Sequence, residues 1–177
     1  MIIEDTILFL RDFIDSDFEP LCELFADSDV MKFSEGVRYS TWVRQWLTDN
    51  LMKKNDEDPV HHYGVVRKSD NAFLGYCGLL RYEDLNGSPE TELGFRLHRR
   101  YWKHGYGTRA AELMIRYAFD HLDLDRLVAL VDPGNIGSRK VVTGIGMRFE
   151  KDVMLPGYDH ADHLYAIHET YNNLTKE

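Results

Sequence analysis

The stretch Leu93–Ala111 reads LGFRLHRRYWKHGYGTRAA and is the most informative part of this chain. It holds five Lys and Arg residues and no carboxylate, although about one residue in six of the whole chain is Asp or Glu. Gly105 and Gly107 stand where a helical pattern begins, with apolar Ala111, Met114, Ile115, Ala118 and Leu122 recurring at intervals of three and four. Glycines let an anion approach the unpaired amides of a helix start, so the turn predicts a phosphate or pyrophosphate site. An ordinary helix start in a solvated basic turn is the alternative.

The sequence around this turn predicts a mixed α/β chain. The predicted strands are Ile7–Arg11, His62–Arg67, Ala72–Tyr82, Glu90–His98, Arg126–Val131, Phe149–Leu155 and Leu164–His168. The predicted helices are Phe18–Ala26 with Ser16 or Asp17 as cap, one that starts at Ser40 or Thr41 and gives way to a polar linker at Lys53–Pro59, then Gly107–His121 and Ile136–Thr143. Trp42 and Trp46 lie four residues apart in the second helix, which indicates core packing.

Composition bounds the class of protein. The chain has 177 residues, 44% of them hydrophobic and 12% aromatic, which predicts one folded domain over residues 1–177. A net charge of −9 argues against nucleic acid or an anionic membrane as a partner. The start MIIEDTILFLR shows no signal-peptide pattern, and Cys22 and Cys77 form no CxxC motif, so a cytoplasmic protein without a disulfide framework is expected.

A dinucleotide-binding domain is an alternative hypothesis, because Gly105, Gly107 and Ala110 fit the G-x-G-x-x-G/A pattern and Asp132 follows a later strand. In that motif the first glycine follows its strand almost immediately. Here the seven residues His98–His104 intervene, and only about seventy residues follow the motif, too few for both nucleotide-binding halves. An NAD(P)-dependent oxidoreductase is therefore the least favoured hypothesis.

Two motifs in order along the chain resemble those of the GNAT superfamily of N-acyltransferases. Trp102–Gly107 is similar to its phosphate turn, Gln/Arg-x-x-Gly-x-Gly/Ala, with Trp in the first place. Asn135–Ser138, followed by Gly146 and Met147, is similar to its Asn-x-x-Ser element before a short helix. The Trp version resembles the branch that contains the ribosomal-protein N-terminal-alanine acetyltransferases.

The resemblance implies a mixed, mostly antiparallel sheet of about six to seven strands flanked by about four helices. It implies direct transfer of acetyl from acetyl-CoA to a peptide N-terminus or a small-molecule amine in a ternary complex, without a metal, and is compatible with a homodimer. Many members carry a Lys where this chain has Gly144, and a Tyr acid where it has Val142. The second departure leaves the general acid unassigned and keeps a non-catalytic acyl-CoA sensor as an alternative.

The resemblance also implies roles for individual residues. Glu92 is the candidate base, Ser138 the candidate donor to the CoA sulfur and Tyr165 a second candidate acid; their alternatives are a surface carboxylate, a helix cap and a core tyrosine. Asn135 and the backbone of Phe95, Arg96 and Leu97 would hold the pantetheine arm. The pyrophosphate would lie on Lys103, His104, Gly105, Tyr106, Gly107 and Thr108, and the 3′-phosphate on Arg99, Arg100 or Arg109.

The acceptor pocket is expected between Val30–Tyr39 and Pro156–His163, which flank the motifs in the implied topology. A metal site is not predicted. His160 and His163 are three residues apart and His61 and His62 are adjacent, but neither pair has a third ligand at a suitable spacing.

Overall fold

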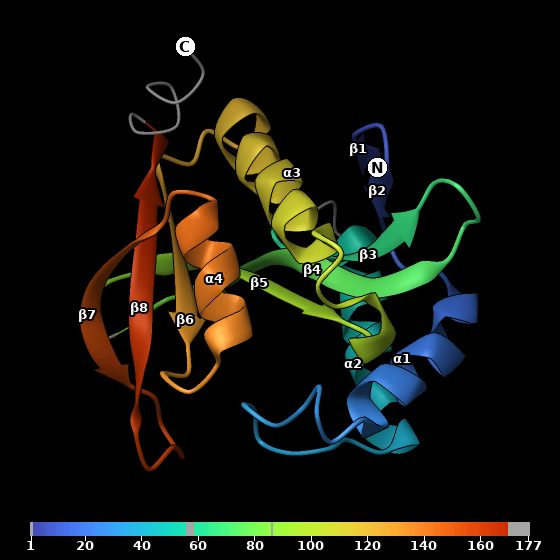
Figure 1. Ribbon diagram of the computed structural model, residues 1–177, viewed down its shortest axis with the longest axis horizontal. Helices are drawn as coiled ribbons and strands as arrows, with labels where there is room; N and C mark the ends of the chain where they lie inside the picture. Colours follow the sequence, from blue (N-terminus) through green and yellow to red (C-terminus); the bar gives the residue numbers. More distant parts are fainter. Residues whose placement is uncertain (1, 56–58, 86, 170–177) are drawn as a thin grey trace.

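A computed structural model describes residues 2–55, 59–85 and 87–169 of the chain. These residues form one eight-stranded sheet with the order β1-β2-β3-β4-β5-β6-β8-β7 (Figure 1). The strands are β1 Ile2–Glu4, β2 Leu8–Arg11, β3 His62–Arg67, β4 Phe73–Tyr82, β5 Glu90–Leu97, β6 Arg126–Val131, β7 Arg148–Met154 and β8 Ala161–His168. The helices are α1 Phe18–Ala26, α2 Ser40–Asn55, α3 Tyr106–His121 and α4 Ile136–Gly144, with 3-10 turns η1 Asp15–Asp17 and η2 Arg99–Tyr101.

All neighbouring strands pair antiparallel except β5 and β6, which are parallel. The mixed, mostly antiparallel sheet with four α-helices confirms the predicted fold class. The sheet has one strand more than predicted, because β1 pairs with β2 at Ile3↔Leu10. Three residues are too few to show an alternating pattern, so this strand becomes recognisable only through its partner.

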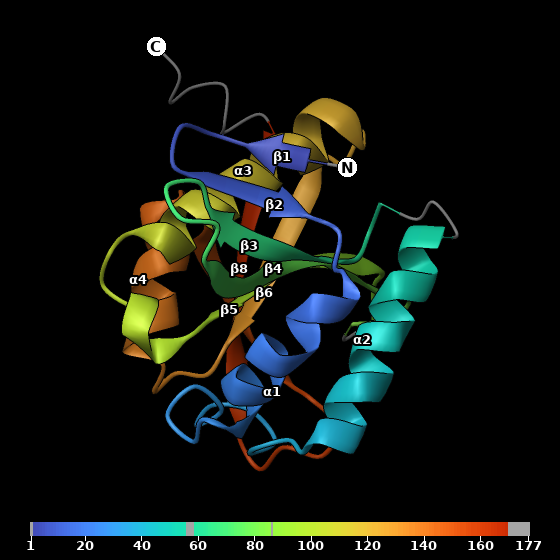
Figure 2. The same ribbon diagram turned by 90° about the vertical axis from the view of Figure 1, so that its right-hand side faces the viewer.

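The helices lie on both faces of the sheet. Figures 1 and 2 show α3 and α4 on one face and α1 and α2 on the other. The α3 face holds the largest core, to which Leu93, Leu97 and Met114 belong, and Val43 and Leu47 of α2 lie in a second core with α1. Trp46 packs against that second core as predicted, whereas Trp42 is 40% exposed. None of the helices in residues 2–55, 59–85 and 87–169 has the length and apolar character needed to cross a membrane.

Three local predictions need correction. Helix α2 continues through Lys53–Asn55, where a linker was predicted; residues 56–58 of that linker lie outside the described residues. Strand β8 begins at Ala161 rather than Leu164, because its polar first residues pair with β7. Asp17 precedes α1 but does not cap it, since its carboxylate binds the guanidinium of Arg11 at 2.7 and 2.8 Å.

Candidate active site

The parallel strands β5 and β6 separate soon after they begin. Strand β5 pairs with β4 from Glu90 to Leu97, but it pairs with β6 only at Glu92↔Val128. Beyond Glu92, the β6-facing edge of β5 therefore has no paired strand among the described residues. Unpaired peptide groups on such an edge are available to a ligand. Figure 1 shows the two strands diverging, with β5 leading to α3 and β6 leading to α4.

The turn from β5 to α3 is fixed in an open shape. Trp102 donates a hydrogen bond from Nε1 to the carbonyl oxygen of Leu97 at 2.8 Å, which ties the turn to the end of β5. Lys103 and Gly105 adopt left-handed conformations with φ of 63° and 78°. A Cβ on Gly105 would meet nothing within 4 Å. The Trp at the first motif position thus anchors the turn and leaves the surface over Gly105 open.

The backbone amides of this turn are unpaired. Within the described part of the chain, no N–H from Lys103 to Thr108 donates a hydrogen bond. The first paired amide of α3 belongs to Arg109, which donates to the carbonyl oxygen of Gly105 at 3.1 Å. The first turn of α3 also carries no acidic side chain. Unpaired donors at the positive end of a helix form a site suited to an anion.

Gly107 lies where three elements of the site meet. A Cβ added there would lie 3.8 Å from side-chain atoms of Phe95, Leu97 and Val141. These residues come from β5 and α4, so the start of α3 packs against β5 and against the helix that follows β6. The predicted cofactor residues Phe95 and Leu97 are therefore adjacent to the predicted phosphate turn.

The basic side chains of the stretch differ in their partners. Arg99 is paired with Asp29, Arg100 with Glu23 at 3.6 Å, and Arg109 with Asp5 at 2.7 Å. Lys103 is exposed and has no carboxylate partner among the described residues. The three arginines suggested for the 3′-phosphate thus each have a carboxylate partner, whereas Lys103 has none among the described residues. The His104 ring stacks on that of Tyr106 with centroids 5.8 Å apart.

Arg96 serves the opposite side of the sheet. Its Nη1 contacts the sulfur of Met31 at 3.0 Å, and its Nη2 donates to Oγ of Ser34 at 2.6 Å. Its side chain therefore holds the segment between α1 and α2, and only its backbone remains for the cofactor role expected of it. Gly75 fixes the same point of β5, because a Cβ there would lie 2.1 Å from the carbonyl oxygen of Arg96.

The second motif begins α4. Asn135 caps this helix, since its Oδ1 accepts a hydrogen bond from the backbone N–H of Ser138 at 3.0 Å. The capping role that was an alternative for Ser138 thus belongs to Asn135, whose side chain is occupied in this way. The Ser138 hydroxyl makes no hydrogen bond within the described residues and is partly exposed. It is free to act as a donor.

Val142 occupies the position at which many members of the family carry a tyrosine acid. Val142 is 1% exposed and lies in the core between the sheet and α3. A side chain there contacts apolar neighbours, so this position supplies no proton donor. Gly144 ends α4 with nothing within 4 Å of an added Cβ.

Glu92 is half-buried in β5 and accepts a hydrogen bond from the neighbouring strand β4. Its Oε2 accepts a hydrogen bond from the Tyr82 hydroxyl at 3.0 Å. Burial, with a smaller contribution from the charge of Asp162, raises the pKa of Glu92 from 4.5 to about 7, against the hydrogen bond from Tyr82. A carboxyl group with such a pKa can accept and return a proton near neutral pH.

Two residues on the same face of the sheet as Glu92 were not singled out from the sequence. Tyr82 is one; burial raises the pKa of its phenol, which keeps it a donor toward Glu92. His62 is the other, and its ring stands above Gly94, with Nε2 4.0 Å from where a Cβ of that glycine would lie. Burial lowers the pKa of His62 to about 3, so the ring is neutral. The signal for both was the sheet register, which places β3, β4 and β5 side by side.

The structure does not bring Tyr165 to Glu92. Tyr165 is 4% exposed and belongs to the core under α3, beside Phe149 with ring centroids 6.0 Å apart. Val128, the partner of Glu92, belongs instead to a core with Leu164 on the other face. Glu92 and Tyr165, the candidate base and the second candidate acid, therefore lie on opposite faces of the sheet.

The two segments expected to flank an acceptor lie on the Glu92 face. Ser34 of the first segment binds Arg96, and the ring of Phe33 would lie 3.3 Å from a Cβ on Gly134. Tyr158 of the second segment is close enough to Glu35 and Arg96 for their charges to act on its pKa, which burial raises. The segments thus converge beside β5.

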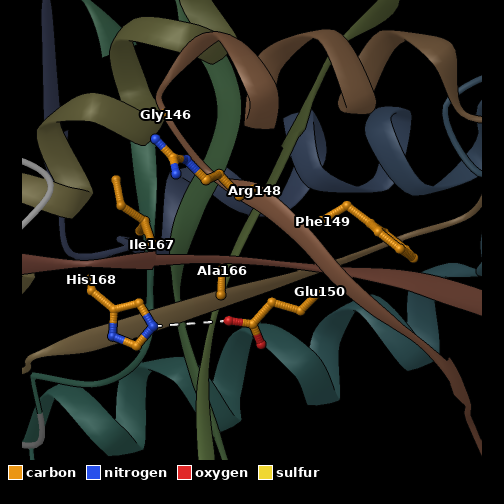
Figure 3. A pocket seen from close by; sticks show the side chains of 7 residues that line it. All are labelled: Gly146, Arg148, Phe149, Glu150, Ala166, Ile167 and His168. Carbon is orange, nitrogen blue, oxygen red and sulfur yellow. Dashed lines mark ion pairs between the residues drawn. The ribbon is translucent and has the colours of Figure 1, made fainter.

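A separate hollow lies at the other end of the sheet, along β7 and β8 (Figure 3). Its lining residues are Gly146, Arg148, Phe149, Glu150, Ala166, Ile167 and His168. Within it, His168 Nε2 lies 3.9 Å from Glu150 Oε1. None of the predicted site residues lines this hollow.

The chain is similar to known acetyltransferases in both sequence and structure. Residues 8–148 match the family model described as an acetyltransferase (GNAT) domain. An N-acetyltransferase of Bacillus licheniformis, p20, is 29% identical over 157 residues, which cover 87% of this chain and 85% of the relative.

Solved structures show the same fold. An acetyltransferase of the GNAT family from Bacillus anthracis has a TM-score of 0.83 and 30% identity, covering 96% of this chain and 99% of its own. The ribosomal L7/L12 alpha-N-protein acetyltransferase RimL, solved in complex with coenzyme A, has a TM-score of 0.78 at 18% identity, covering 95% and 98%. The chain therefore belongs to the GNAT acetyltransferase family and is an N-acetyltransferase.

Proposed function

We propose that this chain transfers the acetyl group of acetyl-CoA to a primary amine, by direct attack of the amine in a ternary complex. The observation that carries the proposal is the run of unpaired N–H groups from Lys103 to Thr108, placed beside the diverging strands β5 and β6. The complex of RimL with coenzyme A, a protein of the same fold, supports the choice of donor. When bound, acetyl-CoA supplies an activated thioester.

The residues of this chain divide the work between donor and acceptor. The amides from Lys103 to Thr108 bind the pyrophosphate, and Lys103 adds a positive charge. Peptide groups of Phe95–Leu97 on the free edge of β5 bind the pantetheine arm. The hydroxyl of Ser138 donates a proton or a hydrogen bond to the CoA sulfur as it departs.

Glu92 is the proposed base. An amine arrives protonated at neutral pH and must lose a proton before it attacks. Glu92 accepts that proton, directly or through a water molecule, and the Tyr82 hydroxyl at 3.0 Å holds the carboxylate in place. The acceptor approaches between the segments Val30–Tyr39 and Pro156–His163. A peptide N-terminus and a small-molecule amine are the two acceptor classes.

A thiol-release assay tests the function. The protein is mixed with acetyl-CoA and a panel of amines and N-terminal peptides, and free CoA thiol is followed. Turnover on at least one amine, with loss of turnover in Glu92→Gln, is expected. Binding of acetyl-CoA without transfer to any acceptor would favour a sensor, and binding of NAD(P) in place of CoA would refute the proposed donor site.

A further inference from the structure

Asp132, His160 and Asp162 come together where β6 ends and β8 begins. One ligating atom of each residue lies within 4.8 Å of the others. The antiparallel register pairs Val131 with His163, which places Asp132 and Asp162 opposite each other. Like charges in directly opposite positions destabilise a sheet, so this arrangement favours a cation between the two carboxylates.

Asp162 points to a ligand independently of that cluster. The residue is only 9% exposed, and its Oδ1 atom is buried without a hydrogen bond. Its contact within the cluster is His160 Nε2, at 3.8 Å, which exceeds a hydrogen-bond distance. A buried carboxylate oxygen without a hydrogen bond is costly unless a further group satisfies it.

The neighbouring contacts orient the three ligands. His160 Nε2 lies 2.9 Å from Oδ2 of Asp132, while its Nδ1 lies 2.8 Å from Oδ1 of Asp159. The other oxygen of Asp132 accepts a hydrogen bond from the N–H of Gly134 at 2.6 Å. A carboxylate on the second nitrogen of an imidazole is the usual outer partner of a metal-bound histidine, because it fixes the ring and its tautomer.

The two separations measured from His160 suit a small tetrahedral ion. Bonds of about 2.0–2.2 Å to zinc place neighbouring ligand atoms about 3.3–3.6 Å apart. The observed 2.9 and 3.8 Å from His160 Nε2 to the two aspartates bracket that range. One imidazole and two carboxylates also form a donor set that zinc accepts, and their two negative charges balance its charge.

We propose that Asp132, His160 and Asp162 bind one zinc ion, with Asp159 orienting His160. The ion would join two segments: the loop between β7 and β8, which carries His160, and the turn after β6, which carries Asp132 and lies 28 residues earlier in the chain. Zinc therefore fixes the segment Pro156–His163 on the Glu92 face. The prediction of no metal site considered pairs of histidines and found no third ligand at a suitable spacing; Asp162 lies two residues from His160, and the fold adds Asp132 from the turn after β6.

The test is zinc binding by the full chain, prepared without a polyhistidine tag and stripped with a chelator. Calorimetric titration with zinc chloride should show one ion per chain, and zinc should raise the melting temperature. Asp162→Asn should weaken binding at least tenfold and remove the thermal shift. Asp152→Asn is the matched control, because Asp152 forms a two-residue pair with His163 at 3.6 Å and should leave zinc binding unchanged.

A second variant keeps the test decisive if Asp162→Asn does not fold. His160→Gln changes a side chain that is 45% exposed, so it should fold normally and lose the zinc. Asp159→Asn should weaken zinc binding by about 10- to 100-fold, as expected of an outer partner. Absence of stoichiometric zinc in the wild type, or undiminished affinity in His160→Gln, would overturn the proposal. A response to magnesium or calcium but not to zinc would overturn it as well.

Discussion

Replacing Glu92 tests the proposed base most directly, because its pKa sets a measurable pH dependence. With a pKa of about 7, about one tenth of Glu92 is ionised at pH 6 and about nine tenths at pH 8. The wild-type kcat/KM should therefore rise about tenfold over this interval. Glu92→Gln should lower turnover by about 10²-fold or more at neutral pH and should lose the inflection near pH 7.

Tyr82→Phe should change the pKa of Glu92 by an amount that follows from the lost hydrogen bond. The Tyr82 hydroxyl donates to Glu92 and stabilises its ionised form. A hydrogen bond to a charged group is worth about 1.5–3 kcal/mol, which corresponds to about 1–2 pH units. The inflection should therefore move upward from about pH 7 to about pH 8 or above. Glu90→Gln, which removes another carboxylate from β5, should leave the inflection in place.

The assay is the thiol-release rate from pH 5.5 to 9, measured for all variants on one acceptor. The acceptor amine has its own pKa, but it contributes equally to every profile, so differences between profiles belong to the protein. An inflection that persists in Glu92→Gln, or that stays near pH 7 in Tyr82→Phe, would refute the assignment of Glu92 as the base.

Burial of Glu92 also affects stability. Its pKa rises from 4.5 to about 7 on folding, so its favourable contribution is complete below pH 4.5 and is lost as the pH rises through about 7. Above that pH the ionised group opposes folding by at most about 3 kcal/mol. Urea unfolding should thus find Glu92→Gln more stable than the wild type at pH 8 and similar to it at pH 4. A less stable variant at pH 8 would contradict the buried environment.

Three further predictions concern the donor site and the start of α4. Gly105→Val should weaken CoA binding at least tenfold, because it places a branched side chain at φ of 78° over the amides. Gly87→Val is the control: its φ of 96° and open surroundings are similar, and it should bind CoA normally. Calorimetry measures both affinities, and equal affinities would contradict the proposed phosphate turn. Lys103→Ala should weaken CoA binding more than Arg109→Ala and should reduce its salt dependence, since Arg109 is already paired with Asp5; the reverse order in titrations at several salt concentrations would exclude Lys103. Asn135→Ala should lower the free energy of unfolding by about 1 kcal/mol through loss of the α4 cap, and unchanged urea unfolding would show that the cap is not stabilising.

Local patterns predicted the elements that are long and periodic. The apolar spacing from Ala111 to Leu122 predicted α3 to within one residue at its start, since a helix that packs on one side must repeat at intervals of three and four. The basic turn before it was predicted from its glycines, and the structure shows its amides unpaired. These features depend on neighbours in the chain, which the sequence displays directly.

Features that depend on distant partners could not be predicted in this way. Tyr82 and His62 lie on the Glu92 face because of the strand register, and Tyr165 lies on the other face for the same reason. The sequence around each of them shows only a tyrosine or a histidine in a strand.

The main elements from β2 onward, the glycine turn before α3 and the two family motifs were predicted from the sequence alone, because each rests on contacts within about a dozen residues; the short strand β1 was not predicted. Only the tertiary structure decided which charges remain unpaired. It joined Arg99 to Asp29 and Arg109 to Asp5, and it brought Asp132 to His160. Side-chain pairing across the sheet depends on how strands align in space, and on the burial that alignment creates. The pKa of Glu92 arises from that burial.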